Sequence, residues 1–142
     1  TIGLHFDETV YGKDISENQL IYYIRKERDL LESILEKKVD TVSMHEPSSH
    51  ILNMDLKIPD MINSYSKKYF HEYKYLSDSM MRWREDAETI VREGKYQKLH
   101  ILTHPFWYQE TEMLRKDILE EYINEASFVR KDMISRYYSE II

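Results

Sequence analysis

The chain has 142 residues, no cysteine and a formal net charge of −6 at pH 7. This length is typical of one domain with its own core, and an acidic chain is a poor partner for a phosphate backbone. The composition therefore argues against nucleic-acid binding, disulfides and thiolate ligands, and leaves imidazole and carboxylate as the metal-binding side chains. No stretch approaches about 18 consecutive apolar residues, so we expect no membrane span and a cytoplasmic protein.

The first third of the chain predicts a strand, a helix and a second strand. Ile2–Phe6 is apolar and strand-like. Ser16, followed three residues later by Gln19, has the form of a capping box, and apolar residues at helical spacing predict a helix over 17–38. Val39–Met44 predicts the next strand. This order predicts a βαβ unit with a right-handed crossover.

The rest of the chain continues to alternate between strands and helices. Residues 45–65 have no sustained periodicity and are predicted as a long loop. After this loop we expect a strand over 69–76, a helix over 77–94, a strand over 98–103, and one long or two shorter helices over 111–141. The pattern predicts a single α/β domain with parallel strands, crossover helices and a long C-terminal helical segment.

Three histidines lie at or just after the ends of predicted strands: His5, His45 and His104. The carboxyl ends of parallel strands meet at one edge of a sheet, where α/β folds collect their catalytic groups. His5 and Asp7 are two positions apart, so in extended backbone they point to the same side and can share a metal. The sequence therefore predicts that His5, Asp7 and His104 meet in one polar pocket.

The surroundings of these residues suggest their roles. His104 precedes a proline and an aromatic run that includes Trp107, and such an imidazole is suited to proton donation. His45 precedes a Glu-Pro pair and either binds the metal or orients a substrate. Asp78 and Trp83 could supply a carboxylate and a sugar-stacking indole, although helix capping and core packing explain them equally well.

Four motifs occur in a fixed order along the chain. They are Ile2-Gly3-Leu4-His5-Phe6-Asp7, Ser43-Met44-His45-Glu46-Pro47, Tyr75-Leu76-Ser77-Asp78-Ser79 with Trp83-Arg84-Glu85, and Leu102-Thr103-His104-Pro105-Phe106-Trp107. In this order they resemble the polysaccharide deacetylase superfamily, in particular its small, divergent members found with surface-polysaccharide biosynthesis. The resemblance covers most of the chain up to about residue 108.

The resemblance implies a partial or distorted (β/α) barrel that holds a divalent metal, zinc by preference and otherwise Co, Mn, Ni or Fe. His5 is similar to the first histidine of the family's metal motif. The second metal histidine would fall at Thr9, and the family's aspartate motif would precede Thr1. We therefore expect Asp7 to substitute as a ligand, and the domain to be incomplete at its N-terminus.

The same resemblance implies the remaining roles. His104 is similar to the family's histidine acid, and Asp78 and Trp83 are similar to the aspartate and tryptophan that brace the site. His45 takes the place of the family's arginine-proline motif, and His45, Trp83 and Trp107 are the expected substrate contacts. The implied reaction is removal of an N-acetyl group from a sugar or related amide, by a metal that polarises the carbonyl and activates water.

Two other functions stay open. One is a catalytically inactive carbohydrate-binding or assembly protein with the same fold, which would lack the aspartate pair of the first strand. The other is a different strand-end metallohydrolase such as a phosphoesterase, and the scarcity of basic residues near the histidines counts against it. The sequence does not identify the substrate, the metal or the oligomeric state.

Overall fold

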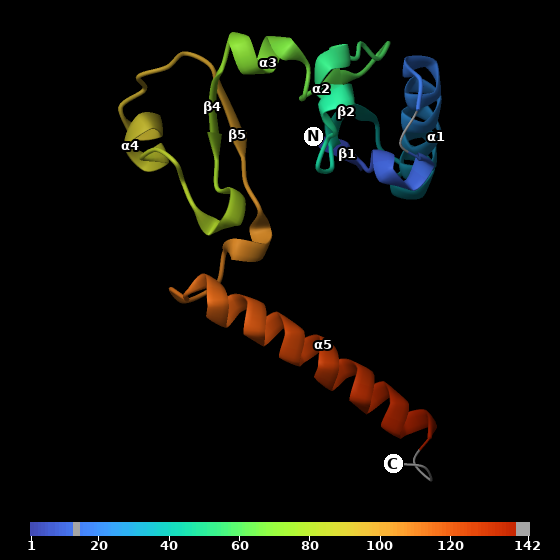
Figure 1. The fold of residues 1–142 in the computed structure, drawn as a ribbon, viewed down its shortest axis with the longest axis vertical. Helices are drawn as coiled ribbons and strands as arrows, with labels where there is room; N and C mark the ends of the chain where they lie inside the picture. Colours follow the sequence, from blue (N-terminus) through green and yellow to red (C-terminus); the bar gives the residue numbers. More distant parts are fainter. Residues whose placement is uncertain (13–14, 139–142) are drawn as a thin grey trace. The chain divides into compact units, whose positions relative to one another are not determined.

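The computed structural model describes residues 1–12 and 15–138. The chain divides into two compact units (Figure 1). We call them unit 1, which is Thr1–Tyr75 with Ile90–His100, and unit 2, which is Leu76–Thr89 with Ile101–Ile142. The division passes through three elements, β4 (Lys74–Ser77), α4 (Ala87–Arg92) and β5 (Leu99–Leu102).

Unit 1 is built on a three-stranded parallel sheet of order β1-β2-β3. The strands are β1 (Ile2–Phe6), β2 (Val39–Met44) and the short β3 (Ile62–Asn63). Leu4 and Phe6 are buried while Gly3 and His5 are exposed, because successive residues of a strand face opposite sides of the sheet. The two strands predicted from the sequence are confirmed within their expected bounds.

The helix α1 (Glu17–Leu35) joins β1 to β2. The predicted capping box is present, since the Ser16 hydroxyl accepts from the Gln19 N–H and the Gln19 side chain accepts from the Ser16 N–H. The helix ends three residues before the predicted end because Glu36 adopts a left-handed φ of 52°.

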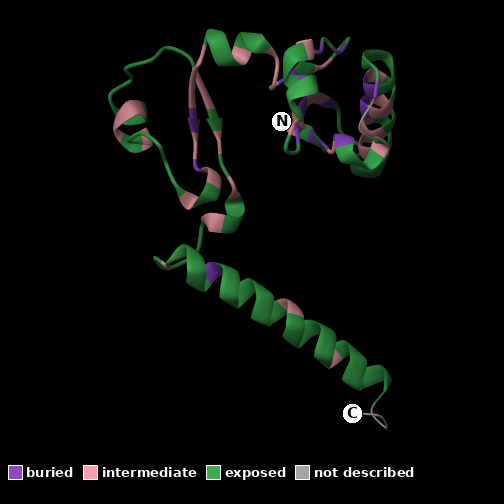
Figure 2. Cartoon of the chain, in the orientation of Figure 1, coloured by how far each residue is buried: buried purple, intermediate pink, exposed green. Residues whose placement is uncertain are grey.

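The core of unit 1 lies between this helix, the sheet and the segment after β2 (Figure 2). Its buried residues are Leu4, Phe6, Ile15, Leu20, Ile24, Val39, Val42, Met44, Ile51, Leu56 and Ile58.

Two predictions in the middle of the chain are wrong. The expected loop over 45–65 contains α2 (Ser49–Met54) and β3, and α3 (Lys67–His71) occupies the start of the strand expected over 69–76. Both helices are too short to leave a periodic pattern. The first turn of α3 also depends on a distant group, because the Asp55 carboxylate accepts from the Lys67 N–H at 2.7 Å.

In unit 2, the first predicted helix is not found as expected, whereas the predicted C-terminal helix is. A 3-10 turn at Ser79–Met81 and the short α4 replace the helix expected over 77–94. The helix is interrupted because Met80 and Met81 take left-handed φ values of 61° and 56°. The C-terminal segment forms one helix, α5 (Arg115–Tyr137), the first of the two alternatives.

The fold is a mixed α/β arrangement with short parallel strands and a long C-terminal helix. Besides the three-stranded sheet, β4 pairs with β5 in a separate two-stranded sheet. The Lys74 N–H bonds to the Lys98 carbonyl and the Asp78 N–H to the Leu102 carbonyl, so these strands also run in parallel. The part of the chain that the structure describes forms no closed barrel.

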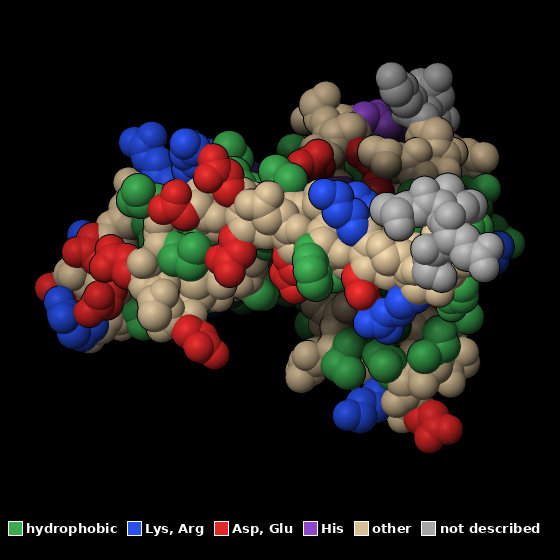
Figure 3. Space-filling model, turned by 90° about the horizontal axis from the view of Figure 1, so that it is seen from below, with side chains coloured by type: hydrophobic (Ala, Val, Ile, Leu, Met, Phe, Trp, Pro, Cys, Tyr) green, Lys and Arg blue, Asp and Glu red, His purple; other side chains and the backbone are tan. Residues whose placement is uncertain are grey.

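The helices and the surface charge bear on the expectations about membranes and charged partners. In residues 1–12 and 15–138, no helix is both long and apolar enough to cross a bilayer. Figure 3 shows acidic and basic side chains mixed on the face it draws.

Candidate functional site

In unit 1, the ends of two neighbouring strands bring His5 and His45 together. β1 and β2 are parallel with His5 beside Ser43, and the His45 N–H continues this ladder by donating to the Phe6 carbonyl at 2.8 Å. The Nε2 atom of His5 lies 3.0 Å from Nδ1 of His45, with the rings nearly perpendicular at 84°. On its other side, His5 Nδ1 lies 2.9 Å from the Ser43 hydroxyl.

The distance between the two histidine nitrogens is close to that of two ligands of one metal ion. Two imidazole nitrogens bound to one tetrahedral zinc, at about 2.0–2.1 Å each, lie about 3.3 Å apart. The observed separation of 3.0 Å is close to that value, but it belongs to a hydrogen bond between the two rings, so both rings would have to turn before their nitrogens faced one ion. The contact with the Ser43 hydroxyl fixes the orientation of the His5 ring from its other side.

Asp7, the predicted second ligand, is engaged by Thr9. Its carboxylate accepts from the Thr9 hydroxyl at 2.6 Å and from the Thr9 N–H at 2.9 Å. These two hydrogen bonds are the main cause that lowers the pKa of Asp7, and the nearby His45 and His5 lower it slightly further. Within the described ranges, no group of three or more His, Asp or Glu side chains is arranged to hold a metal.

Glu8 is a neighbour that the sequence reasoning did not consider. It is only 7% exposed, although it follows directly after Asp7, and its carboxylate accepts from the Ser48 N–H at 2.6 Å. Ser48 is the N-cap of α2, so Glu8 connects the segment after β1 to the segment after His45. The sequence held no clear signal for it, because the contact spans 40 residues.

In unit 2, Asp78 and His104 form a hydrogen-bonded pair after the ends of β4 and β5. Asp78 is 3% exposed, and its Oδ1 lies 2.6 Å from Nδ1 of His104. Its Oδ2 accepts from the His104 N–H at 2.9 Å and from the Tyr108 hydroxyl at 2.9 Å. The sequence singled out Asp78 and His104 but not Tyr108, which lies in the aromatic run after His104.

Electrostatics keep the carboxyl group of this pair ionised. Burial by itself raises the pKa of Asp78, but the hydrogen bonds from the His104 side chain, the His104 N–H and Tyr108 together lower it below its usual value. Burial and the bond to Asp78 raise the pKa of Tyr108, which keeps the phenol protonated. Because an ionised carboxylate only accepts, Nδ1 of His104 carries a proton in this bond, and Nε2 is the ring nitrogen that Asp78 does not engage.

The two tryptophans predicted to contact substrate also lie in unit 2. Trp83 follows the 3-10 turn after Asp78 and is 37% exposed. Trp107 ends a second 3-10 turn, Pro105–Trp107, and packs edge-on against Phe106. Its indole Nε1 is buried without a hydrogen-bond partner among the residues described. An unmet buried donor of this kind is unusual.

The predicted site residues therefore form two groups, each described within its own unit. His5, Asp7 and His45 belong to unit 1, and Asp78, Trp83, His104 and Trp107 belong to unit 2. The convergence of His104 with His5 and Asp7 stays a prediction.

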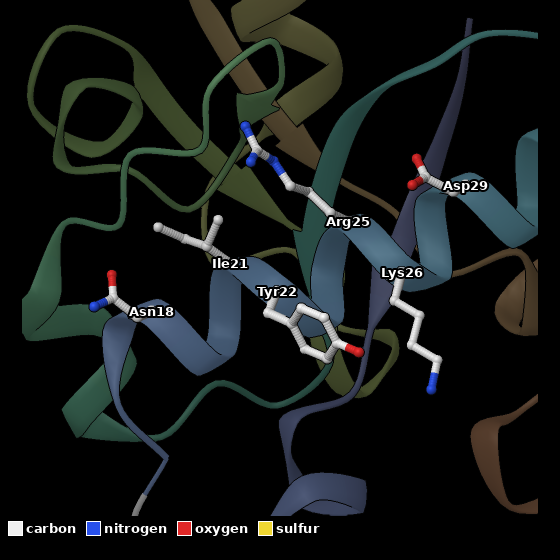
Figure 4. Close-up of a pocket in the computed structure, with 6 residues that line it drawn as sticks. All are labelled: Asn18, Ile21, Tyr22, Arg25, Lys26 and Asp29. Atoms are coloured by element: carbon white, nitrogen blue, oxygen red, sulfur yellow. The ribbon is translucent and has the colours of Figure 1, made fainter.

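A surface hollow of about 420 Å³ on the outer side of α1 includes none of these residues. It is lined by Asn18, Ile21, Tyr22, Arg25, Lys26 and Asp29 (Figure 4).

Comparisons of this chain with protein-family models, with curated proteins and with solved structures find no match.

Proposed function

We propose that this chain is a metal-dependent hydrolase of the polysaccharide deacetylase kind, which removes an N-acetyl group from a sugar or a related small amide. In this proposal its strands belong to a (β/α) barrel of that type. The observation that carries the proposal is the buried, ionised Asp78 bonded to His104. Cleavage of an amide requires a proton for the leaving amine, and a positioned histidine is the commonest donor of that proton.

The groups around His104 give it the properties of such a donor. Asp78 fixes the ring through both the backbone N–H and Nδ1, so the orientation and the tautomer are set before a substrate binds. Because Nδ1 is bonded to Asp78, Nε2 is the ring nitrogen that would deliver the proton that the leaving nitrogen needs. Tyr108 holds the second carboxylate oxygen, so Asp78 itself is a positioning residue.

The histidine pair of unit 1 supports the metal-binding half of the proposal. His5 and His45 would hold the ion through Nε2 and Nδ1, and Asp7 is the further ligand suggested by the sequence. When bound, a divalent metal polarises the N-acetyl carbonyl and lowers the pKa of a bound water. Two imidazoles favour zinc among the metals considered, because imidazole nitrogen is one of its usual ligands.

Strained backbone beside both groups also supports a functional role. Glu46, directly after His45, has a φ of 42°, and Met80 and Met81, just after Asp78, have φ values of 61° and 56°. Non-glycine residues in this region cost of order 1–3 kcal/mol each, and such strain concentrates at functional sites.

The test is release of acetate from oligosaccharides of N-acetylglucosamine, measured with zinc-loaded and chelator-treated protein. We expect turnover with zinc only. His104→Gln should lower the turnover number by about 10² to 10⁴, the usual contribution of a general acid. His5→Ala should lower both zinc affinity and turnover. His71→Gln is the matched control, because His71 is exposed on α3 and belongs to neither group.

Two outcomes would contradict the proposal. Turnover that is unchanged in His104→Gln would remove the assigned acid. Binding of the oligosaccharide without any release of acetate, in zinc-loaded protein, would favour the inactive carbohydrate-binding alternative instead.

A further inference from the structure

His100, a histidine outside both groups of the candidate site, lies in a cluster of aromatic rings in unit 1. Its ring centroid is 5.2 Å from those of Phe70 and Tyr75 and 6.1 Å from that of Tyr69, and the ring planes meet at 62° to 67°. Phe70 extends the cluster, since its centroid is 5.3 Å from that of Tyr75 and 5.8 Å from that of Tyr65. His100 of β5 therefore joins α3 to the beginnings of β4 and β5 (Figure 1).

The surroundings of His100 favour its neutral ring. Nδ1 is buried and has no hydrogen-bond partner among the described residues. Burial lowers the pKa of His100 below its usual value, and a hydrogen bond with the backbone of Tyr69 offsets this only in part. In the ranges that the structure describes, no charged group contributes to this shift, so nothing there compensates a positive ring.

The other ionisable groups around the cluster do not respond to mild acid in the same way. Inside it they are phenols, those of Tyr65, Tyr69 and Tyr75. On α3, the Lys68 ammonium lies 5.8 Å from the Tyr69 ring centroid, and after the helix Glu72 pairs with Lys98 of the segment before β5 at 3.2 Å. Imidazole is the side chain whose charge ordinarily changes between pH 5 and 8. Of the groups whose rings form the cluster, His100 is therefore the one that titrates in this interval.

We propose that His100 is a pH-dependent switch, which holds α3 against β4 and β5 while its ring is neutral and releases the helix when the ring is protonated. An imidazolium carries a proton on both nitrogens, so it would bury an Nδ1–H that has no acceptor. Burying an unpaired charge among aromatic rings is costly, and the charged ring avoids this cost by leaving the cluster.

The direction of the pH effect follows from linkage. The folded-state pKa of His100 is lower than the usual 6.5, so the closed arrangement keeps its full stability above pH 6.5. This stability is lost as the pH falls below 6.5 toward the folded-state value. Opening would expose the rings of Tyr69 and Phe70, which contact His100 in the closed arrangement.

The first test follows the His100 ring by NMR in the whole chain as the pH is lowered. The signal is identified by its absence from the spectrum of His100→Gln. We expect a titration midpoint below 6.5. A midpoint at or above 6.5 would overturn the proposal.

The second test measures amide hydrogen exchange at pH 5 and pH 7.5, with rates corrected for the intrinsic effect of pH. Two probes are the Glu72 N–H, which donates to the Lys68 carbonyl within α3, and the Lys74 N–H, which donates to the Lys98 carbonyl between the strands. We expect both to exchange several times faster at pH 5 after this correction, while amides in the middle of α1 stay protected. Equal protection of the two probes at both pH values would contradict the switch.

Variants of two histidines assign the effect to one residue. His100→Phe keeps an aromatic ring but cannot be protonated, so its corrected exchange rates should be the same at pH 5 and pH 7.5. His71→Gln is the matched control, because His71 is exposed on the same helix, and it should respond to pH as the native chain does. His100→Gln is a second variant without a titrating ring, and circular dichroism at pH 7.5 shows which variants are folded. A pH response that persists in a folded His100 variant, or that disappears in His71→Gln, would overturn the proposal.

Discussion

Replacing Asp78 with Asn removes one charge and changes little else in shape. In the native structure this carboxylate accepts three hydrogen bonds, two from His104 at 2.6 and 2.9 Å and one from Tyr108 at 2.9 Å. The amide has a single acceptor oxygen, so it satisfies these donors only if His104 changes its tautomer or Tyr108 turns its hydroxyl. Either rearrangement replaces charge-assisted bonds by neutral ones.

The expected loss of stability is about 2 kcal/mol at pH 7. Hydrogen bonds to a charged group contribute about 1.5–3 kcal/mol against 0.5–1.5 kcal/mol for neutral ones, and three bonds are weakened together. Asp78 is 3% exposed, so solvent does not compensate. Tyr108→Phe removes only the bond from an exposed phenol, and we expect it to cost less than about 1 kcal/mol.

Urea unfolding followed by tryptophan fluorescence measures this loss. The chain's two tryptophans, Trp83 and Trp107, both lie in unit 2, so the signal reports on the unit that contains Asp78. Asp132→Asn is the matched control, since that carboxylate makes an exposed pair with Arg136. It should change stability by less than about 0.5 kcal/mol.

The pH dependence provides an independent check. The folded-state pKa of Asp78 is below the usual 3.8, so the stability that its ionised form contributes is fully present above pH 3.8. That contribution is lost as the pH falls through the lower, folded-state value. The difference between native protein and Asp78→Asn should therefore shrink below pH 3.8. Equal stabilities at pH 7, or a difference that does not change down to acid pH, would refute this reasoning.

Two further predictions concern unit 1. Glu36→Gly should stabilise the protein by about 0.5–1 kcal/mol in thermal unfolding, because Glu36 ends α1 with a left-handed φ of 52° that glycine adopts freely. Asp55→Gly, at the corresponding position of α2, should show no such gain, because it removes the acceptor of the Lys67 N–H. The Glu27 carboxylate, followed by burial, raises the pKa of Tyr11 to about 12, so stability from the neutral phenol is complete below pH 10 and lost toward pH 12. Tyr11→Phe should flatten this decline in urea unfolding measured across that range, and an unchanged decline would contradict the assignment.

The strongest local signals in the sequence predicted the elements of unit 1 well. The capping box at Ser16 and Gln19 marks the start of α1, because both of its hydrogen bonds are made within four residues. Ile2–Phe6 and Val39–Met44 have the composition of strands, and both are found as predicted. Sequence periodicity could not predict α3, whose first turn depends on the carboxylate of Asp55, twelve residues away.

In the candidate site, too, local sequence signals predicted some features and long-range contacts determined the others. From the sequence alone, His5, His45 and His104 could be placed at strand ends, because the strands are visible in the residue pattern. That His5 lies 3.0 Å from His45 follows from the parallel register of β1 and β2, which is a long-range property of the sheet. For Asp78, local reasoning left helix capping and function in balance. The tertiary structure shows that Asp78 makes no capping hydrogen bond. Its carboxylate accepts from His104 and Tyr108 instead, because residues 26 positions apart meet only when β4 and β5 pair, and burial then gives the carboxylate three donors in place of water.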